Sequence, residues 1–261
     1  MNERPARSLK DVVRRLLPKR IKGHRILAGR LKGMRIVTSW HDYPAAITGR
    51  TERSLLEWFA ENVRPGETWL DVGAHYGYTA MALSRFVGPK GRVFAFEPAL
   101  RTAGCLAETR RMNRLSQLIV IPMGLANPAA LGLDLLCVTR GMADATLAKR
   151  PESGRAMEPI VLARLDWLWP QVCRSRSEIH GLKIDVQGME LEALRGMCET
   201  LRKGRPKLVL ELHTGVDRGA LLDILGDAGY ERVGTPVEPV LGEEEAQYID
   251  DRSYSFRVST G

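Results

Sequence analysis

The stretch "WLDVGAHYGYTA", residues 69–80, decides the fold of this chain. A short apolar run ends in Asp71, and the glycines Gly73 and Gly77 follow it four residues apart. Residues 78–87 then show the apolar spacing of an amphipathic helix. A strand, a glycine turn and a helix in this order are typical of an α/β unit, in which the turn lies at the carboxyl end of the strand. The stretch therefore predicts a ligand-binding turn at one edge of a parallel sheet.

The rest of the chain repeats this alternation of short apolar runs and longer periodic segments. Strands are predicted at 68–73, 92–98, 118–124, 182–188 and 206–213, and helices at 50–63, 78–87, 100–113, 189–203 and 218–229. Residues 230–234 and 253–260 can add two terminal strands, and residues 131–140 an irregular β insertion. We expect a Rossmann-like, doubly wound α/β fold, in which helices cover both faces of a mostly parallel seven-stranded sheet.

The positive charge of the chain is concentrated at its N-terminus. Residues 1–35 hold twelve Lys and Arg against Glu3 and Asp11, a net +10, so the rest of this 261-residue chain of net charge +8 sums to −2. Apolar and basic residues alternate in patches before Pro18, which predicts a short amphipathic helix. We therefore divide the chain into a basic N-terminal helical arm and cap, residues 1–48, and a catalytic domain, residues 49–261, that folds without residues 1–35.

A basic amphipathic helix of this kind can lie on an anionic membrane surface. A solvated arm, or a helix packed across the mouth of the pocket, fits the same residues. The four cysteines are spaced too widely for a metal knuckle, and no signal-peptide apolar segment is evident. We expect a cytoplasmic protein, peripheral at the membrane if the arm binds lipid. The sequence does not indicate the oligomeric state.

The glycine turn and the next strand together narrow the class of ligand. A dinucleotide fingerprint would require glycine where His75 stands. Glu97, held in extended geometry by Pro98, can accept both hydroxyls of a ribose. S-adenosylmethionine combines a ribose with a small charged tail, whose carboxylate could take the amides of the turn while Asp71 holds its ammonium group directly or through water. Each residue alone also fits a tight turn or a surface acid, but the combination favours the cofactor.

Further motifs give the chain a resemblance to a known family. These motifs are "LDVGAHYGYTA" at 70–80, "FEP" at 96–98, "LDWL" at 165–168, "KIDVQGMELEALRG" at 183–196 and "ELH" at 211–213. Over residues 49–215 the chain resembles the class I methyltransferases and, within them, the FkbM family, which implies S-adenosylmethionine as cofactor. The cofactor-binding residues that the resemblance implies are Asp71, Gly73, Ala74, Gly77, Glu97, Gly124, Ala126 and, in "TGRTE" at 48–52, Glu52. The family pattern usually has Glu where this chain has Gln187.

Three catalytic candidates follow strands at the same edge of the sheet. His213, with an ordinary pKa near 6.5, suits a base at neutral pH, although a structural role also fits. Asp185 stands where related small-molecule O-methyltransferases hold a divalent cation or a substrate hydroxyl, or it anchors its loop by accepting backbone amides; a metal is not established. Glu190 also suits the positive end of its helix. Asp166 suits the N-cap of the helix that follows it.

The leading hypothesis is an S-adenosylmethionine-dependent O-methyltransferase whose partner is a small-molecule or glycan hydroxyl, as the resemblance implies. Methylation of a base amino group commonly uses an Asn/Asp-Pro-Pro-aromatic segment after the fourth strand, where this chain has "DVQG" at 185–188. An RNA methyltransferase is one alternative. Because this motif is missing, a nucleic-acid partner is not favoured. The other alternative is a cofactor-binding protein without turnover.

Overall fold

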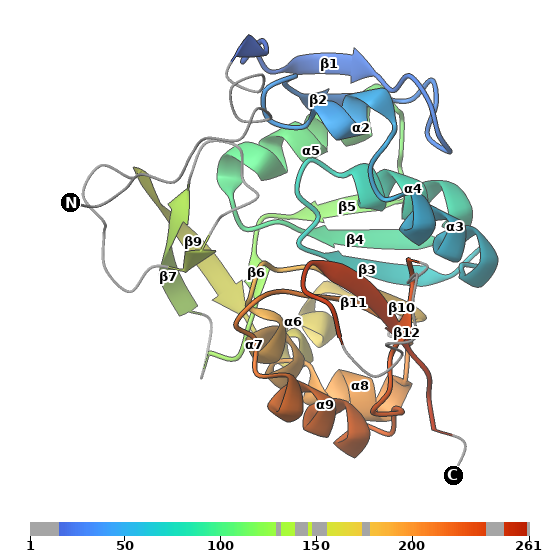
Figure 1. Cartoon of the computed structure of the whole chain (residues 1–261), viewed down its shortest axis with the longest axis vertical. Helices are drawn as coiled ribbons and strands as arrows, with labels where there is room; N and C mark the ends of the chain where they lie inside the picture. Colours follow the sequence, from blue (N-terminus) through green and yellow to red (C-terminus); the bar gives the residue numbers. More distant parts are fainter. Residues whose placement is uncertain are drawn as a thin grey trace.

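The computed structural model describes residues 16–128, 132–138, 146–147, 156–173, 178–238 and 248–259. A seven-stranded sheet lies at the centre of the molecule (Figure 1). In the order of the sheet, the strands are β12 (Thr235–Pro236), β13 (Arg252–Phe256), β11 (Lys207–Leu212), β10 (Gly181–Ile184), β3 (Thr68–Val72), β4 (Arg92–Phe96) and β5 (Leu118–Ile121). The strands from β11 to β5 are parallel, whereas β13 runs antiparallel to both β11 and β12. The predicted mostly parallel, seven-stranded sheet is confirmed.

Helices cover both faces of this sheet (Figure 1). One layer holds α3 (Arg53–Asn62), α4 (Tyr78–Val87) and α5 (Leu100–Met112), and the other α6 (Leu165–Val172), α7 (Glu190–Arg195), α8 (Cys198–Gly204) and α9 (Arg218–Asp227). Consecutive residues of a strand enter opposite cores, as Trp69 and Leu70 do in β3 and Val93 and Phe94 do in β4. This follows from the two-residue period of a strand, which gives a sheet buried on both sides apolar residues at every position.

Two local predictions on the second layer are wrong. The helix predicted at 189–203 is two helices, which meet where Gly196 abuts the chain after β5: a Cβ at this glycine would lie 1.9 Å from the carbonyl oxygen of Ala126. Asp166 does not cap its own helix. Its carboxylate instead accepts hydrogen bonds from the backbone amides of Glu199 and Thr200, at 3.0 and 2.8 Å, and so caps α8.

A second, four-stranded sheet of order β6-β9-β7-β8 follows β5 and lies beside the main sheet (Figure 1). Its strands are β6 (Gly124–Leu125), β9 (Ala156–Ala163), β7 (Gly132–Val138) and β8 (Thr146–Leu147). The β insertion predicted at 131–140 is thus part of a larger sheet. The terminal strand predicted at 230–234 is wrong in its position, because β12 begins at Thr235 and Tyr230 forms an isolated bridge with Val258.

The described part of the N-terminal region is a β-hairpin and a short helix. β1 (Lys22–Arg25) pairs antiparallel with β2 (Arg35–Thr38), and α2 (Pro44–Thr48) follows. Ile26 and Leu31 are almost completely buried in the same core as α3 and α4. Removal of residues 1–35 would take these side chains out of the core. That the domain folds without residues 1–35 stays a prediction. The boundary at residue 48 stays a prediction.

The amphipathic helix predicted before Pro18 falls largely on residues 1–15, outside the described residues. Its contact with an anionic membrane therefore also stays a prediction. Among the helices that the structure describes, none combines the length and the apolar character that a bilayer crossing requires.

The hairpin offers a matched pair of leucines that tests its role in the core. Leu31 is 0% exposed, whereas Leu27 is 55% exposed. Leu31→Ala is expected to lower the free energy of unfolding by about 2–5 kcal/mol, because it leaves a cavity in a packed core. Leu27→Ala is expected to change it by only about 0.5 kcal/mol. Urea denaturation of both variants measures the difference, and equal losses would show that the hairpin is not part of the core.

Candidate active site

The site lies where β3, β4, β10 and β11 end at their carboxyl edge. The strand register brings charged side chains together there, since Lys183 in β10 stands opposite Asp71 in β3. Ile184 stands opposite Leu210, which puts Asp185 next to Glu211 at the following position. Ligands of open parallel sheets bind at this edge.

The glycine turn packs directly against the loop that follows β10. Gly73 has a φ of +84°, and a Cβ at this position would lie 1.7 Å from the carbonyl oxygen of Asp185. Gly77 has a φ of +90°, and its Cβ would lie 2.1 Å from Leu106 Cδ1. Both positions need glycine, since other residues rarely adopt this φ and have no room here. The turn and the catalytic candidates therefore share one small region.

The backbone amides of the turn already have partners within the protein. Those of Gly73 and Ala74 donate to the carbonyl oxygen of Phe96, at 3.0 and 2.9 Å. The amide of His75 donates to Glu97 Oε2 at 2.8 Å. The amides of Gly73, Ala74 and His75 thus hold the turn on β4, and a contact of the turn with the carboxylate of the cofactor stays a prediction.

Glu97 is buried beside the turn and holds it in place. Its Oε1 accepts the amide of Ala99 at 3.0 Å, and its Oε2 accepts that of His75. Burial raises the pKa of Glu97 to about 7. A carboxylate oxygen can accept more than one hydrogen bond, so Glu97 can still accept a ligand hydroxyl.

Asp71 faces the protein interior instead of the ligand edge. It is fully buried, its Oδ2 accepts from Thr79 Oγ1 at 2.7 Å, and its Oδ1 lies 3.4 Å from Lys183 Nζ. This second contact is an ion pair without hydrogen-bond geometry. Burial alone would lower the pKa of Lys183, but Asp185 and Asp71 raise it above its usual range. A direct contact of Asp71 with the ammonium group of the cofactor is therefore not supported.

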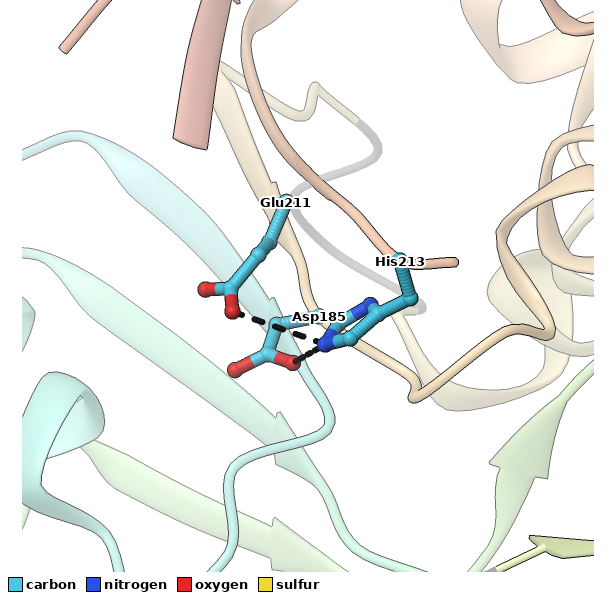
Figure 2. Close-up of side chains that lie close together, drawn as sticks. All are labelled: Asp185, Glu211 and His213. Carbon is cyan, nitrogen blue, oxygen red and sulfur yellow. Dashed lines mark ion pairs between the residues drawn. The ribbon is translucent and has the colours of Figure 1, made fainter. Parts of the chain in front are cut away.

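The three catalytic candidates come together around the imidazole of His213, and Figure 2 shows this ring with Asp185 and Glu211. His213 Nδ1 lies 2.7 Å from Oε1 of the fully buried Glu190, and Nε2 lies 3.6 Å from Asp185 Oδ1 and 3.5 Å from Glu211 Oε1. The Gln187 amide nitrogen lies 2.9 Å from the same Nε2 and 3.2 Å from Asp185 Oδ1. The predicted grouping of Asp185, Glu190 and His213 is thus observed, and Glu211 joins it.

The surrounding carboxyl groups change the chemistry of His213. Burial alone would lower the pKa of this histidine, but its interactions with Glu190, Glu211 and Asp185 raise it to about 10. The expectation of an ordinary pKa is therefore wrong. At neutral pH the ring is an imidazolium, which donates hydrogen bonds and cannot accept a proton. Burial alone would raise the pKa of Asp185, but Lys183 and His213 hold it below its usual range.

The segment before α3 supplies another carboxyl group to this edge. Glu52 adopts a left-handed φ of 52°, and burial raises its pKa to about 7. It interacts electrostatically with Lys183, Glu211 and Asp185. On the turn, burial lowers the pKa of His75 to about 4, so this ring is neutral at neutral pH.

The loop predicted to bind the cofactor after β5 is paired into the second sheet. Gly124 stands opposite Leu162 of β9, and the amide of Ala126 donates to the carbonyl of Ala163 at 3.0 Å. A Cβ at Gly124 would lie 3.5 Å from Pro98, so this loop does lie beside the segment that follows Glu97. Its contact with the cofactor stays a prediction.

Sequence analysis does not identify two charged residues that lie at this edge of the sheet. Lys183 interrupts the apolar run of β10, and Glu211 that of β11. A charged residue within a buried strand needs a partner of opposite charge, so each of these two residues indicates a charged site. Their positions two residues before Asp185 and His213 add to it, because alternate residues of a strand share a face.

Comparison with known proteins identifies the family of this chain. Residues 71–232 match the family model described as Methyltransferase FkbM domain. The chain belongs to the FkbM methyltransferase family. It is thus an S-adenosylmethionine-dependent methyltransferase with the predicted cofactor. The comparison with curated proteins finds no match.

Solved structures are similar to this FkbM chain at low identity. The methyltransferase FkbM from Methylobacillus flagellatus KT is 18% identical, with a TM-score of 0.47, over 82% of this chain and 52% of that one, about half its length. Fibrillarin from Aeropyrum pernix, in complex with natively bound S-adenosyl-L-methionine, is 16% identical, with a TM-score of 0.48, over 91% and 88% of the two chains. An rRNA methylase from Streptococcus thermophilus is 11% identical, with a TM-score of 0.46, over 79% and 95%.

The raised pKa of Glu97 predicts how pH affects stability. Its carboxyl group is neutral in the folded protein below about pH 7 but ionises near 4.5 when unfolded. Between these values the wild type loses stability as pH rises, on the order of 2–3 kcal/mol, because folding then requires protonation of an ionised group. The Glu97→Gln variant has no ionisable group at this position, so it is not expected to lose stability in this way.

Urea denaturation of the wild type and Glu97→Gln at pH 5 and pH 8 tests this expectation, because all other titrations are common to both. The wild type is expected to lose more stability than the variant between the two pH values. Identical pH dependence would show that Glu97 ionises normally in the folded protein.

Proposed function

We propose that this FkbM protein transfers the methyl group of S-adenosylmethionine to a hydroxyl of a small molecule or glycan. The observation that carries the proposal is the division of one sheet edge into two parts. Glu97 and the glycine turn lie at β3 and β4, and the group around Asp185 and His213 lies at β10 and β11. The first part suits a nucleoside and the second a polar acceptor.

On the cofactor side, Glu97 is the residue that we propose for the two ribose hydroxyls. The glycine turn then shapes the cavity through its backbone path, since its amides at Gly73 and Ala74 are engaged with Phe96. Asp71 stabilises the turn by accepting a hydrogen bond from Thr79 at the start of α4. This assignment changes how the turn contributes to binding but keeps the predicted location of the cofactor.

On the acceptor side, we propose that Glu52 accepts the proton of the hydroxyl. As the oxygen attacks the methyl carbon, a C–O bond forms, the C–S bond breaks and the hydroxyl proton passes to the carboxylate. A base works best when its pKa is near the working pH, and that of Glu52 is about 7. His213, as an imidazolium, donates a hydrogen bond or holds Asp185 in place.

The backbone after β10 disfavours methylation of a base amino group. Gln187, at the place of the second proline in the Asn/Asp-Pro-Pro-aromatic segment, has a φ of 53°. Proline cannot adopt this angle, because its ring fixes φ near −65°. The loop is therefore built differently from the Asn/Asp-Pro-Pro-aromatic segment that such enzymes commonly use, which makes RNA the less favoured acceptor.

Methyl-labelled S-adenosylmethionine tests the proposed acceptor class. The full chain is incubated with fractionated hydroxylated metabolites, glycans and RNA, and the labelled product is analysed by NMR. We expect the label on an oxygen of a metabolite or glycan. Label on RNA would contradict the proposal, and cofactor binding without any labelled product would favour the non-catalytic alternative.

Glu52→Gln tests the proposed base. The variant is expected to lower kcat by about 10²-fold or more, because no carboxylate remains to accept the proton. The affinity for S-adenosylmethionine, measured by calorimetry, should be unchanged. Because Glu52 must be ionised to act, wild-type kcat/KM should rise as pH increases through about 7, and this rise should disappear in the variant.

Glu61→Gln, at an exposed position of α3, the helix that follows Glu52, is the matched control and should behave as the wild type. Weaker cofactor binding in Glu52→Gln, in proportion to its lost turnover, would instead make Glu52 the cofactor-binding residue that the family resemblance implies.

A further inference from the structure

We propose that Asp185, Glu211 and His213 form a binding site for a divalent transition-metal ion. Asp185 follows β10, Glu211 lies near the end of β11 and His213 follows β11, and the three side chains converge on one point (Figure 2). One ligand atom from each, the imidazole Nε2 and one oxygen of each carboxyl group, lies within 4.8 Å of the other two.

The spacing of these atoms is close to that of ligands around one ion. Nε2 lies 3.6 Å from Asp185 Oδ1 and 3.5 Å from Glu211 Oε1. Two ligands that are each about 2.1 Å from a metal lie about 3.0 Å apart at a right angle and about 4.2 Å apart when opposite. Shifts of well under 1 Å in the side chains would therefore bring all three atoms into the coordination range.

The carboxyl group of Glu190 orients the imidazole through the ring nitrogen that does not face the proposed ion. Glu190 is fully buried, and its Oε1 lies 2.7 Å from His213 Nδ1 and accepts the amide of Gly188 at 3.0 Å. With Nδ1 as the donor to Glu190, Nε2 points toward Asp185 and Glu211 (Figure 2), and a bound ion would displace the proton that Nε2 carries in the imidazolium. Metal-bound histidines commonly have such a carboxylate on their other ring nitrogen, which fixes the tautomer and the ring orientation.

The charge around the three ligands independently calls for a cation. Four carboxyl groups meet here, those of Asp71, Asp185, Glu190 and Glu211, and their basic partners among the described residues are Lys183 and His213. Oδ1 of Asp71 and Oε2 of Glu190 are both buried without a hydrogen-bond partner in the described part of the chain. An excess of carboxylates over basic groups at a largely buried site is costly, and a divalent ion would offset this cost.

The ligand set indicates which ions fit. One imidazole with two carboxylates suits Mn²⁺, Fe²⁺ or Zn²⁺ better than Mg²⁺ or Ca²⁺, which prefer oxygen ligands alone. Gln187, whose amide contacts both Nε2 and Asp185, can turn its oxygen toward the ion or leave this position.

Such an ion would deepen the proposed function, and this part of the inference rests on it. Three protein ligands leave coordination positions open, and an acceptor hydroxyl at one of them would be held and made more acidic. The hydroxyl would then lose its proton to Glu52 more readily. The metal would select acceptors with oxygen atoms placed to reach it.

Calorimetry and EPR spectroscopy of the full chain, freed of metal with EDTA, test the site. We expect one Mn²⁺ per chain, with weaker binding of Mg²⁺, and pulsed EPR of the bound Mn²⁺ should show the coupling of a coordinated imidazole nitrogen. Glu190→Gln should weaken Mn²⁺ binding about 10–100-fold through the orientation of the ring. Glu211→Gln should weaken it at least as much, and His213→Gln should also abolish the nitrogen coupling.

Glu108→Gln, on the exposed surface of α5, is the control and should bind Mn²⁺ as the wild type does. Circular dichroism and thermal unfolding without metal show that each variant is folded. Asp185 is not substituted, because it also pairs with Lys183. The proposal is overturned if the wild type shows no saturable binding of Mn²⁺ or Zn²⁺ up to about 1 mM. It is equally overturned if folded Glu211→Gln binds Mn²⁺ as tightly as the wild type.

Failure of this site and failure of the proposed function give different results. Methyl transfer to a hydroxyl that continues in excess EDTA, without Mn²⁺ binding, would remove the metal alone. Saturable Mn²⁺ binding that Glu211→Gln weakens, in a protein that transfers no methyl group to any hydroxyl, would keep the metal site and remove the acceptor proposal.

Discussion

The buried ammonium of Lys183 is the constraint on which the sheet edge depends. It lies 3.4 Å from Asp71 of β3 and 3.2 Å from Asp185, which follows β10. A buried charge is tolerated only when it is paired, and removal of one partner of such a pair typically costs about 3–5 kcal/mol. Both carboxylates are therefore held in position by one side chain. Gly73 completes this contact, since only a glycine lets the turn lie against the carbonyl of Asp185.

Local sequence patterns predict most of the sheet and the glycine turn. Alternating apolar runs and helical periods place five parallel strands in the correct order along the chain, because each βα unit is a short-range structure. Gly73 and Gly77 are predictable for the same reason, since a strand that turns sharply into a helix requires left-handed backbone angles. The location of Glu97 follows from its place at the end of the next strand.

The electrostatics of the site are not predictable in this way, because they arise from residues far apart in the sequence. His213 has its raised pKa only because Glu190 and Asp185, 23 and 28 positions earlier, fold against it. Asp71 turns inward because β10 places Lys183 opposite it. Asp166 caps α8 rather than its own helix, and residues 22–38 form a hairpin whose connection enters the core. In each case a tertiary contact overrides the local pattern.

The proposed reaction requires the cofactor to lie between the two parts of the edge, with its reactive end toward β10 and β11. A crystal structure of the protein with S-adenosylhomocysteine, the demethylated product, tests this most directly. The account predicts ribose hydroxyls within hydrogen-bond distance of Glu97 and a sulfur atom that faces Asp185 and His213. A nucleoside bound away from Glu97, or a sulfur directed away from these residues, would contradict it.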